Sequence, residues 1–217
     1  MADKQILVIG LGRFGRVLAE SLVQLGHEVL GVDASPRVVQ ECAEEITHVV
    51  RADGTDVAAL RQLGAADFTR AGVAIGTDIQ ASILATYALV DLGVPSIWAK
   101  AITTEHGAIL ERVGASRVVF PERDMGVRVA HSMVGHTVDY IELDDDFVLV
   151  ETTAPRALVG RSLREAEVRK RHDVTVVCIK PPGGSFTYAT PDTRVEEGDL
   201  IVVAGRVASA EAFAKLD

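Results

Sequence analysis

The sequence predicts an α/β protein with a doubly wound parallel sheet, followed by a small α+β domain. Three observations support this prediction: a glycine-rich turn directly after an apolar strand at residues 6–9, a regular alternation of strand and helix patterns as far as residue 134, and a two-residue hydrophobic period beyond Gly135. We therefore expect two domains, residues 1–135 and residues 136–217. A chain of 217 residues, 48% of them hydrophobic, suffices for one large and one small domain.

The first strand runs into a turn with glycine at positions 10, 12 and 15. In this spacing Gly10 permits a tight turn, Gly12 lets a phosphate approach the backbone, and Gly15 lets the next helix pack closely on the strand. The free amides at the start of that helix face an anion. Glycine-rich turns also occur by chance, but here apolar residues at helical spacing follow the turn: Val17, Leu18, Leu22 and Leu25. The context predicts a Rossmann nucleotide-binding unit.

Two further strands end in an aspartate. Asp33 ends the strand 28–33, about 20 residues after the glycine turn, where a carboxylate binds both hydroxyls of an adenosine ribose and repels a 2′-phosphate. Alternatively it caps the following helix in competition with Ser35. Asp53 ends the strand 48–53, and is placed either to meet the adenine amino group or to cap the helix Val57 to Leu63. The sequence leaves both alternatives open.

The remaining elements of the first domain continue the alternation. The uncharged strand 72–76 fits a buried parallel sheet, and Lys100, at the end of the strand 97–101, is placed for a phosphate contact or for solvent. A helix 105–113, a strand 117–120 and a helix from Pro121 to about Gly135 follow. The helix 78–92 is expected to turn an apolar stripe inward: Ile83, Leu84, Tyr87 and Val90.

Beyond Gly135 the pattern is that of a small α+β domain of about 80 residues. We expect a half-exposed strand 138–143, a turn at residues 144–146, a strand 147–153, a capped helix 162–168, a strand 174–180, a turn 181–185, a strand 200–204 and a closing helix.

Composition excludes several classes of protein. The 31 acidic and 22 basic residues give a net charge of -9, which argues against a surface for nucleic acid. Cys42 and Cys178 form no disulfide framework or metal-ligand spacing, as in a reducing cytoplasm. No apolar stretch reaches the ~18 residues of a membrane span, and the N-terminus reads as a strand and not as a signal peptide. Any membrane role is therefore expected to depend on a partner.

Several short motifs together resemble the RCK proteins, the KtrA-type cytosolic regulatory subunits of bacterial Ktr and Trk potassium channels. They are the turn 10–15, Gly26-His27-Glu28-Val29, Ala74-Ile75-Gly76, Ile79-Gln80-Ala81-Ser82, Trp98-Ala99-Lys100-Ala101, the segment 121–126, the segment 158–163 and Glu197-Gly198-Asp199. The resemblance covers the whole chain, as an RCK N-domain and an RCK C-domain. It implies a homodimer that assembles into a larger, octameric ring, docked under a membrane potassium-translocating subunit of the KtrB or TrkH type.

The resemblance also implies roles for single residues. Arg13 would reach the terminal phosphate of a nucleotide, bound either in the same subunit or in a neighbouring one. Glu122 would help to hold a divalent cation, magnesium or calcium, at the dimer interface. The alternatives are a solvated arginine and a carboxylate that faces a helix dipole. At the position of Asp53 the resemblance leads us to expect a residue with an amide side chain instead of a carboxylate. Some relatives bind cyclic di-AMP between two C-domains, in the area that Arg169 and the strand from Val174 occupy here.

These observations favour nucleotide binding without turnover. A nicotinamide-dependent oxidoreductase is the alternative, but only about 80 residues are left for a substrate domain, and the histidines at positions 27, 48, 106, 131, 136 and 172 form no recognisable catalytic set. An ATPase phosphate loop is absent from the sequence. Arg13 and Glu122 favour ATP or ADP over NAD or NADH. The residues predicted to bind the nucleotide are Gly10, Leu11, Gly12, Arg13, Phe14, Gly15, Asp33, Asp53, Gly76 and Lys100, with Glu122 as the metal ligand.

Overall fold

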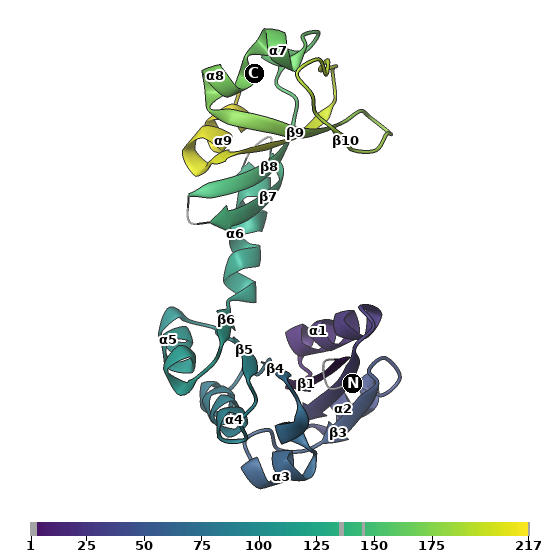
Figure 1. The fold of residues 1–217 in the computed structure, drawn as a ribbon, viewed down its shortest axis with the longest axis vertical. Helices are drawn as coiled ribbons and strands as arrows, with labels where there is room; N and C mark the ends of the chain where they lie inside the picture. The colour runs from purple at the N-terminus through teal and green to yellow at the C-terminus, as the bar shows by residue number, and fades with distance from the viewer. Residues whose placement is uncertain (1–3, 135–136, 145, 217) are drawn as a thin grey trace. The chain divides into compact units, whose positions relative to one another are not determined.

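The computed structural model describes residues 4–134, 137–144 and 146–216. They divide into two compact units, Met1–Glu122 and Arg123–Asp217, each with its own core (Figure 1). The predicted domain boundary at Gly135 lies outside the described residues and stays a prediction. His136, and Asp145 in the predicted turn 144–146, also lie outside the described residues. Within the described residues, no helix is long and apolar enough to cross a membrane.

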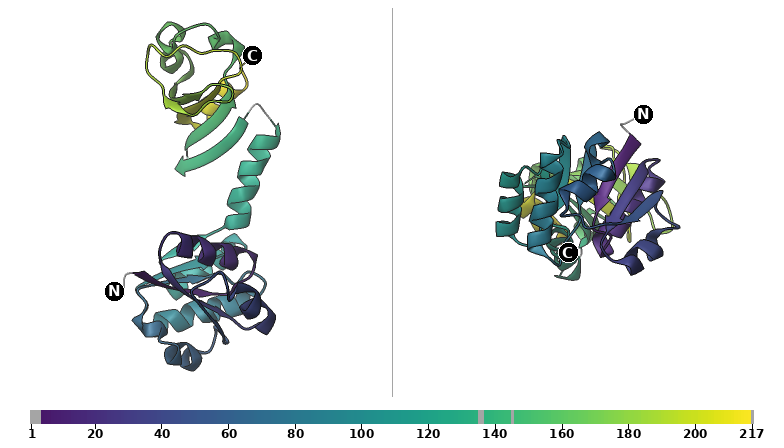
Figure 2. Two further views of the ribbon diagram at one scale, coloured as in Figure 1. Left: turned by 90° about the vertical axis from the view of Figure 1, so that its right-hand side faces the viewer. Right: turned by 90° about the horizontal axis from the view of Figure 1, so that it is seen from below.

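The first unit is built on a parallel sheet with the strand order β3-β2-β1-β4-β5-β6. Its strands are β1 (Gln5–Ile9), β2 (Glu28–Asp33), β3 (His48–Arg51), β4 (Arg70–Val73), β5 (Ser96–Lys100) and β6 (Arg117–Val119). Helices lie on both faces of the sheet (Figure 2). The order reverses between β1 and β4, which is the switch point where open α/β sheets bind ligands. The predicted doubly wound Rossmann-like sheet is confirmed.

Capping side chains start most of the helices of this unit. The helices are α1 (Arg13–Gln24), α2 (Pro36–Cys42), α3 (Val57–Gln62), α4 (Ile79–Asp91) and α5 (Thr104–Val113), with a short 3₁₀ turn η2 (Ala65–Asp67) after α3. Ser35 accepts a hydrogen bond from the amide of Val38, and Asp56, Asp78 and Thr103 cap α3, α4 and α5 in the same way. Among the five α-helices α1 to α5, as far as the structure describes them, only α1 begins without a side-chain cap, at Gly12, so its first amides stay available.

Two expectations for this unit are wrong in detail. The strand predicted at 72–76 is β4, which ends at Val73, and Ala74 to Gly76 instead form a loop over the glycine turn, where a Cβ on Gly10 would lie 2.9 Å from Ile75. Three residues of the predicted inner stripe of α4 are exposed instead, Leu84, Tyr87 and Val90, and only Ile83 packs against the core as expected. The buried face of α4 consists of Leu89 and four small side chains, which let the helix approach its neighbours closely: Ser82, Ala85, Thr86 and Ala88.

The second unit contains an antiparallel sheet with the strand order β10-β9-β11-β8-β7. Its elements are α6 (Pro121–Val134), which begins in the last residues of the first unit, β7 (Thr137–Asp144), β8 (Phe147–Thr153), η3 (Arg156–Leu158), α7 (Leu163–Ala166), α8 (Val168–His172), β9 (Val174–Lys180), β10 (Thr187–Tyr188), β11 (Leu200–Arg206) and α9 (Val207–Ala214). The predicted α+β unit is confirmed. The single helix expected at 162–168 is two helices, because Glu167 adopts a left-handed conformation with φ of 49°.

Candidate functional site: a nucleotide pocket

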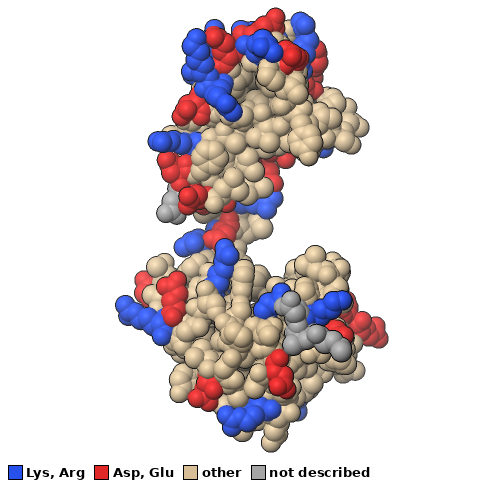
Figure 3. Space-filling view, in the orientation of Figure 1, with Lys and Arg blue, Asp and Glu red and all other residues tan. Residues whose placement is uncertain are grey.

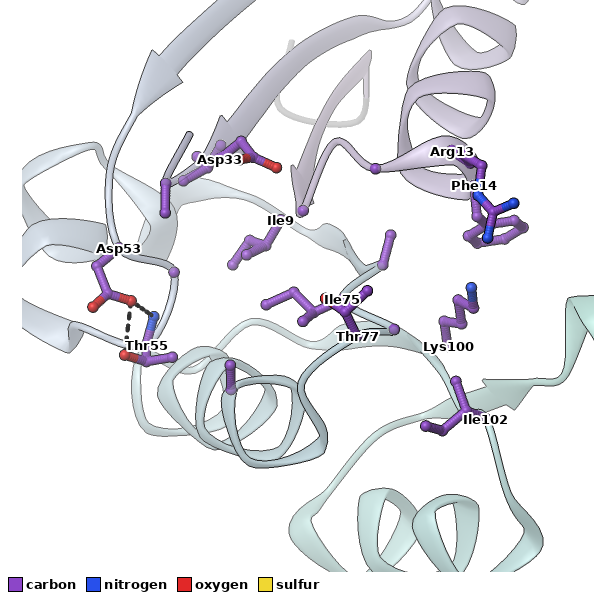
Figure 4. A pocket seen from close by; sticks show the side chains of 18 of the residues that line it. Ile9, Arg13, Phe14, Asp33, Asp53, Thr55, Ile75, Thr77, Lys100 and Ile102 are labelled. Atoms are coloured by element: carbon purple, nitrogen blue, oxygen red, sulfur yellow. Dashed lines mark hydrogen bonds between the residues drawn. The ribbon is translucent and has the colours of Figure 1, made fainter. Parts of the chain in front are cut away.

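A cavity of about 400 Å³ opens at the carboxyl ends of β1 to β5 in the first unit (Figure 4). It lies at the switch point of the sheet. The structure brings together the predicted site residues here, with two exceptions: Leu11 is buried against Gly31, and Gly15 lies beneath the turn. The residues that line the cavity are Ile9, Gly10, Gly12, Arg13, Phe14, Val32, Asp33, Ala34, Ala52, Asp53, Gly54, Thr55, Ala74, Ile75, Gly76, Thr77, Ala81, Lys100, Ile102 and Glu122.

The three glycines of the turn differ in what surrounds them. Gly10 has a φ of +88°, which favours glycine, and a Cβ on Gly15 would lie 1.8 Å from the carbonyl oxygen of Gly10. A Cβ on Gly12 would meet no protein atom within 4 Å. The first and third glycines are therefore required by the fold itself. The second faces open space in the wall of the cavity, which fits a ligand that approaches the backbone.

Asp33 is held by two backbone amides. Its Oδ2 accepts a hydrogen bond of 2.8 Å from the amide of Leu11, and its Oδ1 accepts one of 2.8 Å from the amide of Ser35. Ser35, and not Asp33, caps α2. Each carboxylate oxygen has a second lone pair, so the group retains acceptors for two hydroxyls. This geometry fixes the carboxylate at the end of β2 between the glycine turn and α2.

Asp53 is oriented by its neighbour Thr55, a residue outside the predicted site. Its Oδ1 accepts hydrogen bonds from the Thr55 amide at 2.9 Å and from the Thr55 hydroxyl at 2.8 Å (Figure 4). These bonds lower the pKa of Asp53, so the side chain stays ionised and acts as an acceptor. The expected alternative, a cap on α3, is taken by Asp56, whose Oδ1 accepts from the amides of Ala58 and Ala59.

Lys100 and Glu122 form an ion pair across the wall of the cavity. The distance from Lys100 Nζ to Glu122 Oε1 is 2.5 Å, and the side chains are 9% and 63% exposed, respectively. The hydrogen bond from Lys100 is the largest cause of the lowered pKa of Glu122. A Cβ on Gly76 would lie 2.9 Å from Nζ, so the glycine leaves room for the ammonium. Nζ also lies 5.6 Å from the centroid of the Phe14 ring.

Apart from Glu122, which pairs with Lys100, the charged side chains of the cavity are separated into two ends. Figure 4 shows Asp33 and Asp53 on one side, and Arg13, Phe14 and Lys100 on the other. The acidic end offers acceptors, which suit hydroxyl and amino donors, whereas the basic end and the uncapped start of α1 suit an anion. The residues present therefore fit an adenosine phosphate. In the described part of the chain, no group of three or more His, Cys, Asp or Glu side chains could hold a metal ion.

A second cavity, of about 310 Å³, lies in the second unit beside α7, α8 and β9. Arg169 is part of its wall and donates a hydrogen bond of 3.0 Å from Nε to the hydroxyl of Thr175. Arg164 lies in the same wall and pairs with Asp192 at 3.0 Å. Lys and Arg side chains lie over the end of the unit that carries α8, interleaved with Asp and Glu side chains (Figure 3). The wall of the cavity thus contains Arg169 and the start of β9, the two features that the sequence connects with a ligand of the second unit.

Comparison with protein families identifies this architecture. The model of the TrkA-N domain matches residues 6–121, and the model of the TrkA-C domain matches residues 147–216. The chain belongs to the TrkA family of RCK proteins. Among its relatives is the Ktr system potassium uptake protein A of Bacillus subtilis, 39% identical over 97% of this chain and 96% of that protein. The Ktr system potassium uptake protein C of the same organism is 38% identical, over 98% of this chain and 96% of that protein.

Solved structures of RCK proteins share the fold. The RCK domain of GsuK superposes with a TM-score of 0.68 and 21% identity, over 97% of this RCK chain and 46% of the GsuK chain. The GsuK channel bound to NAD superposes with a TM-score of 0.67 and 21% identity, over 96% of this chain and 38% of the GsuK chain. GsuK bound to ADP superposes with a TM-score of 0.51 and 22% identity, over 59% of this chain and 34% of the GsuK chain. The chain thus spans less than half the length of these GsuK chains, and the likeness shows the RCK fold.

Proposed function

We propose that this RCK protein is the nucleotide-sensing regulatory subunit of a bacterial potassium uptake system, on the cytoplasmic side of the membrane. The observation that carries the proposal is a pocket with separate acidic and basic ends, in a chain 39% identical to a potassium uptake protein over nearly its full length. The partner is a membrane potassium-translocating subunit of the KtrB or TrkH type. Because binding energy can shift a conformational equilibrium without chemistry, the nucleotide acts as a signal and not as a substrate.

ATP and ADP are the nucleotides that we propose for this pocket. Arg13 lies at the basic end, where a guanidinium can bind the oxygens of a terminal phosphate in a bidentate manner. In NAD the second phosphate is esterified to another ribose, so it offers no free terminal phosphate. Structures of GsuK are known with NAD bound and with ADP bound, which keeps NAD as the alternative.

A divalent cation would be held by Glu122 together with phosphate oxygens. The carboxylate is largely exposed at the rim of the pocket, and hard cations prefer carboxylate and phosphate oxygens. Because no cluster of three ligands exists among the described residues, the remaining ligands would be nucleotide oxygens, water molecules or groups of a second subunit. The cation would screen the repulsion between the triphosphate and Glu122.

Glu122→Gln should remove the stabilisation that magnesium or calcium adds to the ATP-bound protein. We expect the wild type with ATP to gain a few degrees in melting temperature on addition of the cation, and the variant to gain nothing while still binding ATP. Differential scanning fluorimetry with and without the cation measures this. Glu105→Gln is the matched control, since Glu105 also lies in the first turn of a helix but outside the pocket. If the melting temperature of Glu122→Gln with ATP rises on addition of the cation as much as that of the wild type, Glu122 is not a ligand of the cation.

Assembly into dimers and a larger ring is part of the proposal. Exposed apolar side chains on α4 and α6 support it, because such surfaces in regulatory proteins are commonly covered by another subunit. On α4 these are Ile79, Leu84, Tyr87 and Val90, and on α6 they are Met125, Val127, Val129 and Met133.

We further propose cyclic di-AMP as a ligand of the cavity in the second unit. Arg164 and Arg169 line the cavity and would bind phosphate oxygens, and apolar residues such as Val168 and Val176 in the same wall would contact the bases.

Potassium flux tests the proposed function directly. Proteoliposomes that contain the membrane subunit from the same genome should take up potassium at different rates when this protein is added with saturating ATP or with saturating ADP. We expect a difference of roughly fivefold or more, the usual lower range of allosteric coupling. Vesicles with the membrane subunit alone should show no nucleotide effect. Equal rates with both nucleotides, in the presence of a formed complex, would contradict the proposal.

A further inference from the structure

The basic end of the nucleotide pocket already contains an anion. The Glu122 carboxylate contacts the ammonium of Lys100, whose side chain is 9% exposed. An ammonium at such a depth is costly to leave unpaired, and Glu122 compensates its charge. The Phe14 ring and the backbone of Gly76 lie beside the same ammonium.

A phosphate that enters this end meets Lys100 while Glu122 still holds it. The ammonium has three protons and can donate to two anions, but those anions would then lie within a few ångströms of each other. Two like charges at about 4 Å repel each other, and more strongly at a protein surface than in bulk water. The phosphate chain and the carboxylate therefore compete for one cation. Of the two anions, Glu122 is the one that can leave Lys100, because its side chain is 63% exposed and can turn into solvent.

We propose that Lys100 and Glu122 form a competition switch, in which the phosphate chain of a bound nucleotide displaces Glu122 from Lys100. This inference rests on the proposed function, since it gives the device by which the same pocket senses its nucleotide. Glu122 is the second residue of α6, the helix that continues into the second unit. Displacement thus changes the electrostatic environment of the first turn of α6, at the link between the two units.

The experiment is a double-mutant cycle measured by calorimetry in EDTA, with ADP and adenosine as ligands. We expect Glu122→Gln to bind ADP about three- to tenfold more tightly than the wild type, because a neutral amide competes weakly for Lys100. Adenosine, which has no phosphate, should bind both proteins equally. In the Lys100→Met background, the same Glu122→Gln change should alter ADP affinity by less than about twofold. If Lys100→Met does not fold, Lys100→Gln takes its place.

The outcomes separate the switch from simple repulsion. Glu105→Gln removes a carboxylate outside the pocket and should leave ADP affinity unchanged. An equal gain in ADP affinity on both lysine backgrounds would overturn the inference, because repulsion between Glu122 and phosphate does not need Lys100. A loss of ADP affinity in Glu122→Gln would overturn it as well. Absence of ADP, ATP and NAD binding to the wild type would instead overturn the proposed function, on which the inference rests.

Discussion

Gly15→Ala is expected to destabilise the first unit by about 3 kcal/mol or more, at or above the upper end of the usual cost of overpacking. The added Cβ would lie 1.8 Å from the carbonyl oxygen of Gly10 and 2.9 Å from the Cβ of Ala74. The first of these atoms belongs to the backbone of the turn, so α1 must move away from the sheet. Urea unfolding followed by circular dichroism measures the loss.

Gly12→Ala is the matched control for Gly15→Ala. Its Cβ would meet no protein atom within 4 Å, so stability should change by less than about 1 kcal/mol. The methyl group would occupy the wall of the pocket where a phosphate approaches, and nucleotide affinity should fall sharply. Equal loss of stability in the two variants would show that the turn is not packed as described, and unchanged nucleotide affinity in Gly12→Ala would place the phosphates elsewhere.

Asp33→Ala is expected to weaken the binding of ATP, ADP, NAD and NADH alike, by roughly 1–3 kcal/mol. All four share the adenosine ribose, and the variant loses the carboxylate that the amides of Leu11 and Ser35 hold at the end of β2. Calorimetry with the four nucleotides measures the effect, and the wild-type titrations also rank the nucleotides.

Asp56→Ala provides the comparison for Asp33→Ala. Asp56 caps α3 and is not among the residues of the pocket wall, so its loss should cost about 1 kcal/mol of stability and leave nucleotide affinity unchanged. A folded Asp33→Ala variant with wild-type affinity would show that the ribose does not contact this carboxylate.

The sequence alone was enough to predict the order of the elements and the edge of the sheet at which the site lies. The glycine turn, the alternation of strands and helices, and aspartates at strand ends are local patterns, and parallel strands bring their carboxyl ends to one edge. Asp33, Asp53 and Lys100 could therefore be assigned to one pocket before their contacts were known. Thr55 and Thr77 follow strand ends in the same way, and that position was the available signal for them.

The faces of the helices were predicted less well. In α4 the larger apolar side chains of Leu84 and Tyr87 are exposed, and Ser82 and Ala85 are buried. The same holds for α1, where Gly15 and Ala19 are buried and Val17 is 60% exposed. Hydrophobic periodicity marks apolar faces, but it does not distinguish a face that packs on the sheet from one left for another surface.

Local residue patterns were enough to predict the α/β class with a second α+β unit, the glycine turn and the acidic strand ends, because each pattern reflects the conformations of neighbouring residues. The pairing of Lys100 with Glu122, the room that Gly76 leaves for the ammonium, and the hydrogen bonds from Thr55 to Asp53 became visible only in the folded structure. The first two contacts join different strands, loops and helices, and the third depends on the conformation of one loop. Their geometry follows from the strand order and from close packing, which local residue patterns do not encode.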